Sequence, residues 1–459
     1  MPNTYIEYAK GGTDYRAKGT ISCWVKRSEL GREQYVWGWG ENNSSDCYLR
    51  FDTADNIEIN ADGAGTNYNS TALFRDTNAW YHFVFSIDGQ NSTANLRRRF
   101  WINGVQQDEG QGSVSAFSAA VFGWHSSQDL WIGANPRQQQ ASGHSYFNGL
   151  ISHFHYCSNY SYTASDFGEY DANGVWKIKT SPNVQYGSEG FFLKMENSSN
   201  MDLDSSSNNK TLTTNGTLTK TEDSPSNVFA TFNSLASWRG QNNTPQAVLA
   251  NGNLKTGIGT SEVTLLTSTI GVKSGKYYWE AKSDGVSKMF FGVVNSRAFG
   301  ETNAPHDSSS YSGIHYYEGT TDFRYYSGAT SSTGAVSISS GDILGFAMDC
   351  DNSVLWIHKN GVYMNSGVPT SGDTGTGAIN RLFNYAGSLF YDNGVKTEMF
   401  ASAYVSSTSG SGTASFNFGN GYFGTTAVSS AGTNASGIGI FEYDVPTGFT
   451  ALSTKGLNL

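Results

Sequence analysis

The stretch Gly341–Val362 reads GDILGFAMDCDNSVLWIHKNGV and holds two short apolar runs separated by polar and small residues. The runs are Ile343–Met348 and Val354–Lys359, and both have the length and residue types of strands. Asn360-Gly361 follows the second run, and this dipeptide accepts the positive φ angles that a type I′ turn requires. The stretch therefore predicts two antiparallel strands with a further tight turn after the second.

The second of these runs directs its side chains alternately to two faces. Leu355 and Ile357 share one face, and Trp356 points to the other. The first run pairs with it and sets Phe346 against one of these faces. Because both faces of a strand inside a sandwich are covered, we expect Trp356 in a core rather than at the surface.

A related motif occurs near the other end of the chain. Arg99–Val105 reads RFWINGV, so it again joins Trp-Ile to Asn-Gly-Val inside a region of short alternating runs. A chain of 459 residues is too long for one hydrophobic core and suits two domains of about 200 residues each. The sequence therefore predicts an all-β protein made of two tandem antiparallel β-sandwiches.

The composition agrees with this fold class. The chain has 53 Gly, only 8 Pro and 14% aromatic residues, which is typical of many strands joined by turns and not of collagen or a disordered tract. A net charge of −10 argues against a nucleic acid partner, which needs clustered Lys and Arg. The one sharp basic run, Arg97-Arg98-Arg99, is interpreted as a solvated strand end.

Two further absences in the sequence bear on where the protein is made. No basic segment followed by an apolar one opens the chain, and no window approaches the roughly 18 apolar residues of a membrane span, so we expect neither a signal peptide nor membrane insertion. The 4 cysteines have no paired spacing. Reduced, mostly buried thiols are therefore expected, as in a protein made in cytoplasm.

The first half carries an ordered series of strand motifs. They are TISCWVKR (20–27), WYHFVFSIDG (80–89), RFWINGV (99–105), LWIGA (130–134) and FNGLISHFHY (147–156). This series resembles laminin-G-like, concanavalin A-like jelly rolls. The stretch Gly174–Asn209 that follows resembles the downstream extension of such domains in virion proteins of marine tailed phages. The fold hosts lectins, enzymes and structural modules, so it does not by itself give a function.

The second half carries another ordered series. It consists of SGKYYWEAK (274–282), FFGVVNS (290–296), the stretch 341–362, MFASAYV (399–405), ASFNFG (414–419) and YDVPTGFTALSTKGL (443–457). This series resembles a SPRY domain, which implies a bent sandwich that offers loops to a partner and has no catalytic residues. We expect a jelly roll over 1–210, a linker over 211–224 and a SPRY-like sandwich over 225–459, with loop insertions at 364–398 and 425–439.

One pattern could belong to an enzyme. Glycosidases with a concanavalin A-like fold place carboxylates on one strand face, and Glu58, Asn60 and Asp62 would share a face in a strand. Retaining hydrolysis needs two carboxylates about 5–5.5 Å apart, whereas Glu58 and Asp62 would be roughly 13 Å apart in a regular strand. The middle position is Asn60 rather than a carboxylate, so a solvated outer face is the favoured interpretation.

Two groups of residues could bind a metal ion. His153 and His155 flank Phe154 and could form a two-nitrogen edge, but zinc needs four ligands and the sequence supplies no third, which favours half-exposed strand positions. Asp202 and Asp204 open an oxygen-rich stretch, and calcium takes six to eight oxygens. Calcium at Asp202 and Asp204 stands as a candidate beside a solvated linker, and no other cofactor is expected.

Aromatic residues supply the candidate binding residues. Such rings stack on sugars or pack on protein partners at low entropic cost. Alternation would bury one member of each adjacent tyrosine pair, and the two tryptophans could share a buried face. The candidates are Trp37, Trp39, Tyr316, Tyr317, Tyr325 and Tyr326.

These observations together suggest a non-enzymatic structural or adhesive protein of a tailed-phage virion, assembled in the host cytoplasm. Its expected partners are other virion proteins and a host-surface glycan. Capsid decoration and a tail or fibre position remain open, and the particle would set the oligomeric state. The alternative is a polysaccharide-degrading enzyme that uses the jelly roll.

Overall fold

A computed structural model describes most of the chain. The described residues are 4–9, 18–40, 47–60, 67–107, 129–135, 146–239, 247–258, 263–284, 289–300, 313–317, 322–324, 330–331, 334, 336–382, 388–392, 394–406 and 413–458.

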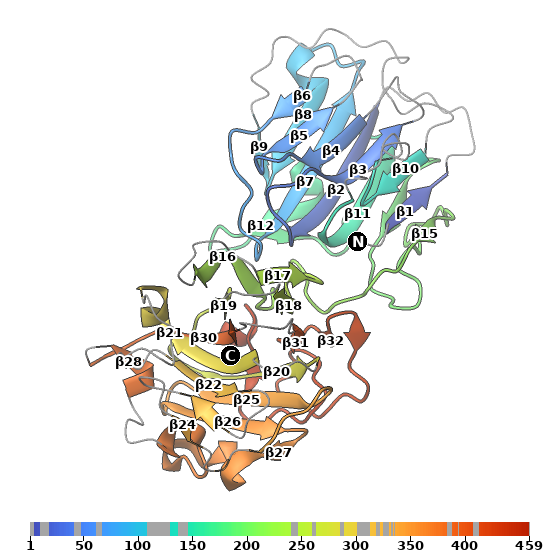
Figure 1. Cartoon of the computed structure of the whole chain (residues 1–459). Helices are drawn as coiled ribbons and strands as arrows, with labels where there is room; N and C mark the ends of the chain where they lie inside the picture. Colours follow the sequence, from blue (N-terminus) through green and yellow to red (C-terminus); the bar gives the residue numbers. More distant parts are fainter. Residues whose placement is uncertain are drawn as a thin grey trace. The chain divides into compact units, whose positions relative to one another are not determined.

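Within this part of the chain, residues gather into two compact units. The first spans Met1–Lys220 with Ser224–Ser226, and the second spans Thr221–Asp223 with Asn227–Leu459. Figure 1 colours the first unit from blue to green and the second from green to red. Antiparallel sheets dominate both, so the all-β prediction is confirmed.

The first unit contains two large sheets. In the described residues, one has seven strands in the order β15 (Thr213–Asn215), β1 (Tyr5–Tyr8), β10 (Asp129–Ile132), β3 (Gln34–Gly40), β4 (Cys47–Phe51), β5 (Ile57–Asn60) and β6 (Asn67–Asn69). The other has six, in the order β14 (Phe191–Leu193), β11 (Gly149–Ser158), β2 (Lys18–Arg27), β7 (Trp80–Asp88), β8 (Arg98–Ile102) and β9 (Val105–Gln106). A short helix, α1 (Ala164–Phe167), precedes a hairpin of β12 (Gly168–Tyr170) and β13 (Trp176–Ile178).

The core of the first unit forms from the alternate residues of both sheets. Ile21, Cys23 and Val25 of β2 join it together with Leu49 and Phe51 of β4, which is the face that alternation predicted for β2. All four cysteines of the chain are free and buried, as expected. The prediction that Arg97-Arg98-Arg99 is a solvated strand end is wrong for Arg98, which is only 5% exposed.

The second unit also contains two large sheets within its described residues. One has the order β16 (Phe232–Arg239), β19 (Val263–Ser268), β30 (Met399–Ser406), β21 (Met289–Asn295), β22 (Gly313–Tyr317), β23 (Asp322–Arg324) and β24 (Thr330–Ser331). The other has the order β17 (Ala247–Ala250), β18 (Lys255–Ile258), β31 (Thr413–Asn417), β20 (Lys276–Ser283), β25 (Ile343–Asp349), β26 (Val354–Lys359) and β27 (Val362–Tyr363), with β34 (Thr450–Ala451) beside β20.

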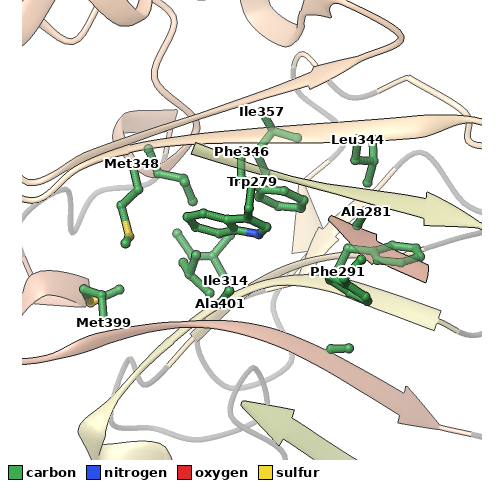
Figure 2. Close-up of a cluster of buried hydrophobic side chains, with 14 of the residues drawn as sticks. Trp279, Ala281, Phe291, Ile314, Leu344, Phe346, Met348, Ile357, Met399 and Ala401 are labelled. Carbon is green, nitrogen blue, oxygen red and sulfur yellow. The ribbon is translucent and has the colours of Figure 1, made fainter. Parts of the chain in front are cut away.

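The predicted hairpin forms as expected. β25 and β26 pair antiparallel with Phe346 opposite Ile357, and the side chains of both strands' inward face enter the core. Figure 2 shows Phe346 and Ile357 in this core around Trp279, whose ring stacks on Phe346 at 5.3 Å. Asn360 has φ 48° and Gly361 has φ 84°, which is the left-handed backbone that the Asn-Gly turn predicts. Trp356 points to the opposite face and is 0% exposed there.

The insertion at 364–398 was expected to be a loop and is more ordered than that. It contains 3-10 turns, among them Pro369–Thr374 and Ile379–Leu382, and a small hairpin of β28 (Tyr391–Asp392) and β29 (Val395–Lys396). Trp356 donates its indole N–H to the carbonyl of Thr376 at 2.8 Å, so the insertion is anchored on β26.

The first unit extends beyond the predicted boundary at residue 210. β15 pairs with β1 as the edge of the seven-stranded sheet, and Leu212 is 8% exposed in the core. These residues fall inside the range 211–224 that was expected to be a linker. The change from one unit to the other lies at 220–227 instead.

Fragments 1–220 and 227–459 are each expected to fold alone, because each has its own hydrophobic core and more than 200 residues. Calorimetry of each fragment should give one cooperative transition. A fragment ending at residue 208 serves as the control and should melt lower than 1–220, since it lacks β15 and Leu212. Aggregation of either longer fragment, or a melt without a cooperative transition, would show that the division is wrong.

Candidate functional site

Trp37 and Trp39 do not form a binding surface. Both lie on the interior face of β3 and are 0% exposed. The ring of Trp39 meets Tyr156 edge-on at 4.9 Å, and that of Trp37 lies 6.2 Å from Phe85 of the facing sheet. The binding prediction for these two residues is wrong, because alternation gives them a common face and the six-stranded sheet covers it.

Tyr316 is likewise a core residue. It is 0% exposed and meets Phe323 edge-on at 4.9 Å, with its hydroxyl donating to the carbonyl of Val336. Its predicted binding role is therefore wrong. Tyr317 lies on β22, but its side chain is outside the described part of the structure, as are Tyr325 and Tyr326.

Asp202 and Asp204 act as acceptors for loop amides. The two oxygens of Asp204 accept three backbone N–H groups at 2.8–3.0 Å and the Ser206 hydroxyl at 2.9 Å. Asp202 accepts the N–H and the hydroxyl of Thr214 at 3.0 and 2.8 Å. Hydrogen-bond donors thus occupy the carboxylates that were proposed for calcium, and calcium at this loop stays a prediction.

His153 and His155 are buried rather than half-exposed. A bulge in β11 gives His153 a φ of 48°, and its Nδ1 lies 2.8 Å from the Ser152 hydroxyl. His155 stacks on Phe192 at 3.9 Å, and its Nδ1 lies 3.0 Å from the Tyr186 hydroxyl. In the part of the chain that the structure describes, no group of three or more His, Cys, Asp or Glu is arranged to hold a metal.

The outer face of the seven-stranded sheet carries the candidate site. Residues paired across neighbouring strands point to the same side of a sheet. Glu7, Trp131, Gly38, Tyr48 and Asn60 are paired in this way across five strands. Successive residues of a strand lie on opposite faces, and Trp37 and Trp39 point inward. Gly38 and the four residues paired with it across the sheet therefore lie on the outer face. A Cβ on Gly38 would lie 3.0 Å from Asn135, so the glycine lets Asn135 lie close against the sheet.

One end of this face is an aromatic ladder, which we define as Tyr146, Tyr5 and Trp131. Tyr5 stacks on Trp131 at 4.0 Å with 20° between the planes, and on Tyr146 at 6.3 Å with 26°. Trp131 is 4% exposed, whereas Tyr5 and Tyr146 are half-buried. Burial and the carboxylate of Glu7 raise the pKa of Tyr5, so its hydroxyl stays protonated at neutral pH. Glu7 accepts the amide of Asn215 at 3.2 Å.

The other end is an arginine–carboxylate group centred on Arg50. Its guanidinium donates to Glu58 at 2.8 Å through Nε, to Tyr35 at 2.8 Å, and to Glu33. Glu58 also accepts the hydroxyl of Tyr48 at 2.9 Å. Arg50 and Glu33 keep 20% and 31% of their side chains exposed. The group therefore offers polar atoms held in fixed positions by ion pairs.

This arrangement does not suit acid–base hydrolysis at Glu58. A general acid or base must reach the substrate with a carboxylate oxygen, and both oxygens of Glu58 accept hydrogen bonds inside the unit, one from Tyr48 and the other from Arg50. Glu58 is 7% exposed, and the other carboxylate that Arg50 contacts, Glu33, is held by the same cation. Asp62 lies outside the described residues. The arrangement is instead suited to stacking and hydrogen bonding.

The sequence did not single out Tyr5, Tyr146 or Trp131 as binding residues. The signal available was weak, because Tyr5 and Trp131 sit in ordinary alternating runs. Their grouping depends on the pairing of β1 with β10, which joins positions that are far apart in the chain.

Comparison with known proteins identifies the fold of the first unit. Residues 3–166 match the family model described as the concanavalin A-like lectin/glucanases superfamily. Over these residues the first unit is similar to laminin G-like, concanavalin A-like domains. That superfamily includes both lectins and glucanases, so the match leaves the activity open.

Similar solved structures include two SPRY domains. The SPRY domain of human HERC1 is 14% identical with a TM-score of 0.29, and covers 40% of this chain and 96% of that one. The TRIM65 PSpry domain is 11% identical with a TM-score of 0.28, covering 41% and 91%. A heptameric SAP-like pentraxin from Limulus polyphemus is 11% identical with a TM-score of 0.27, covering 47% and 89%.

A search among curated proteins found no match to the sequence. Among the described residues, no helix has the length and apolar character needed to cross a membrane.

Proposed function

We propose that the chain is a non-catalytic adhesive protein of a tailed-phage virion, and that it binds glycan through the outer face of its seven-stranded sheet. The observation that carries the glycan part is the aromatic ladder, which has two partly exposed rings beside fixed polar groups on one sheet face. Sugar sites use this combination, since rings supply contact area and polar atoms fix orientation.

The virion part of the proposal rests on the sequence. The motif series resembles laminin-G-like jelly rolls, and the stretch Gly174–Asn209 that follows it resembles the downstream extension of such domains in virion proteins of marine tailed phages. The SPRY-like second unit would then contact other virion proteins.

The charges beside the ladder favour an uncharged glycan. Glu7 lies next to Tyr5, and the Arg50 group carries two carboxylates for one guanidinium. Both ends of the face are therefore net negative. An acidic polysaccharide would be repelled there, whereas hydroxyl groups can donate to these carboxylates.

Tyr5→Ala and Tyr146→Ala are each expected to weaken binding of an uncharged oligosaccharide at least tenfold, about 1.4 kcal/mol. The affinity is measured by calorimetric titration with the full chain, after a glycan screen has supplied the ligand. Tyr170→Ala is the matched control, because Tyr170 is 52% exposed but lies on β12. Equal losses in all three variants would contradict the proposed face.

The alternative, a polysaccharide-degrading enzyme, is tested with the same protein. A reducing-end assay across algal and bacterial glycans is expected to show no turnover. Turnover that Glu58→Gln abolishes would overturn the non-catalytic proposal. Because donors occupy Asp202 and Asp204, a chelator is expected to leave glycan binding unchanged.

A further inference from the structure

The outer face of the six-stranded sheet of the first unit is crossed by the chain that follows β11. A row of hydrogen-bonded hydroxyl groups fixes this crossing. The hydroxyl of Thr20 is hydrogen-bonded to that of Ser86 at 3.2 Å, and the hydroxyl of Ser86 to that of Ser161 at 2.9 Å. Thr20 also accepts the N–H of Tyr162 at 2.9 Å. Tyr160–Tyr162 is thus held over β2 and β7, and it reaches Arg99 on β8.

The guanidinium of Arg99 is half-buried and makes few direct contacts with other groups of the protein. Its Nη2 donates to the Ser161 hydroxyl at 3.0 Å, and its guanidinium lies 5.0 Å from the centre of the Trp101 ring. Its Nε is fully covered and has no hydrogen-bond partner. Burial lowers the pKa of Arg99, which reflects the cost of holding this charge partly out of water.

The charges of Asp88 and Asp166 raise the pKa of Arg99 and oppose the effect of burial, but each carboxylate bonds another partner. Asp88 pairs with Lys18 at 3.2 Å, and Asp166 accepts the N–H of Thr163 at 2.7 Å in the cap of α1. In the described part of the chain, no carboxylate lies within ion-pair distance of Arg99. Asp88 and Asp166 therefore compensate the partly buried charge of Arg99 only at a distance, which favours an anion that bonds the guanidinium directly.

The residues beside Ser161 indicate which kind of molecule carries that anion. Tyr160 and Tyr162 stack nearly parallel, at 5.9 Å and 14°, and Tyr160 is 39% exposed. The guanidinium fork matches planar carboxylates and tetrahedral oxyanions, and stacked rings supply a flat apolar surface. An acidic sugar can use both features, because its acidic group binds the cation and its ring packs on the aromatic side chain. An isolated inorganic ion can use only the cation.

We propose that Arg99 binds the acidic group of a polysaccharide, a uronate carboxylate or a sulfate ester, with the sugar ring on the outer face of Tyr160, which Tyr162 supports from behind. This site lies on the opposite sheet from the ladder, and it is independent of the function proposed above. The two sites differ in ligand charge: the ladder face repels acidic sugars, and the Arg99 site requires them.

The test is calorimetric titration of the full chain with three oligosaccharides of equal length: an oligouronate, a sulfated one and an uncharged one. Arg99→Gln should weaken binding of the acidic ligand at least tenfold, and Tyr160→Ala should weaken it severalfold. Whichever acidic probe binds more tightly identifies the oxyanion. Arg97→Gln is the control, because it removes the same charge two residues away, where Nε donates to the Asn91 carbonyl at 2.7 Å.

Three outcomes would overturn the proposal: no binding of either acidic oligosaccharide, equal losses in Arg97→Gln and Arg99→Gln, or equally tight binding of polyglutamate, which would indicate a protein partner. Tyr5→Ala should leave acidic binding unchanged, so failure of one site is distinguishable from failure of the other.

A stability measurement separates a ligand-binding arginine from a structural one. Arg99→Met removes a partly buried cation that has no direct ion pair among the described residues and keeps most of the side-chain volume. Without ligand, the melting temperature of the first unit should stay the same or rise by a few degrees. A fall of several degrees would show that Arg99 stabilises the fold, and would overturn the proposal.

Discussion

Trp356→Ala should unfold the second unit or lower its melting temperature by about 10 °C or more, while the first unit's transition stays in place. The indole is 0% exposed and packs in a cluster with Tyr278, Val445 and Phe449 on the outer side of its sheet. Truncating a buried Trp costs about 3–5 kcal/mol, a large share of the roughly 5–15 kcal/mol of a domain. The loss also frees the Thr376 carbonyl, which accepts the indole N–H.

Calorimetry of the full chain measures this effect. Val362→Ala is the matched control, because Val362 is 75% exposed on the short strand β27 next to β26. It should leave both transitions unchanged. If Trp356→Ala also left the second transition unchanged, Trp356 would not be a core residue of this unit.

Acidification from pH 7 to pH 5 should destabilise the first unit much more than the second. Burial lowers the pKa of His82 to about 3, of His153 to about 4, and of His155 well below its usual value. Below pH 6.5 the unfolded chain binds these protons and the folded unit does not. Each histidine therefore lowers the free energy of unfolding by about 1.4 kcal/mol per pH unit until its folded pKa is reached.

His82 shows the structural cause. It lies between Trp24 and Trp176, at 4.6 and 5.9 Å, and its Nδ1 accepts the indole N–H of Trp176 at 2.9 Å. Nε2 must then carry the proton that bonds the Ser22 hydroxyl at 2.9 Å. A second proton on Nδ1 would break the bond to Trp176 and place a charge between two rings away from water.

The second unit contains two buried groups, His358 and Glu280, whose protonation has opposite effects on its stability. Burial lowers the pKa of His358 to about 4, which destabilises the unit on acidification. Burial also raises the pKa of Glu280 to about 7, despite donors from the Glu442 and Tyr443 amides. Between about pH 7 and pH 4.5, Glu280 is therefore protonated in the folded unit and ionised in the unfolded chain. This difference stabilises the folded second unit on acidification. The effects of His358 and Glu280 therefore oppose each other.

The measurement is calorimetry of the full chain at pH 7, 6 and 5, with the second transition identified by Trp356→Ala. The first transition should fall by about 10 °C or more and the second by only a few degrees. His82→Gln should make the pH dependence of the first unit shallower by about 1.4 kcal/mol per pH unit. Parallel shifts of both transitions would show that the buried histidines do not set the acid stability.

The sequence by itself determined the local architecture. Asn360-Gly361 and Asn103-Gly104 both adopt the left-handed backbone that their turns require. Alternation gave the correct inward face of β2 and the two faces of β26. These features depend on φ/ψ preferences and side-chain period, which act over a few neighbouring residues.

Tertiary structure decided which faces are covered and which side chains meet. Alternation gives Trp37 and Trp39 a common face, but only the second sheet makes that face the interior. Tyr5 joins the aromatic ladder because β10 brings Trp131 beside it. The sequence predicts that Arg97, Arg98 and Arg99 are solvated, whereas the crossing of Tyr160–Tyr162 over the sheet partly buries Arg99 and bonds it to Ser161. Strand pairing and layer packing join residues that are far apart in the chain, so a local pattern carries no information about these contacts.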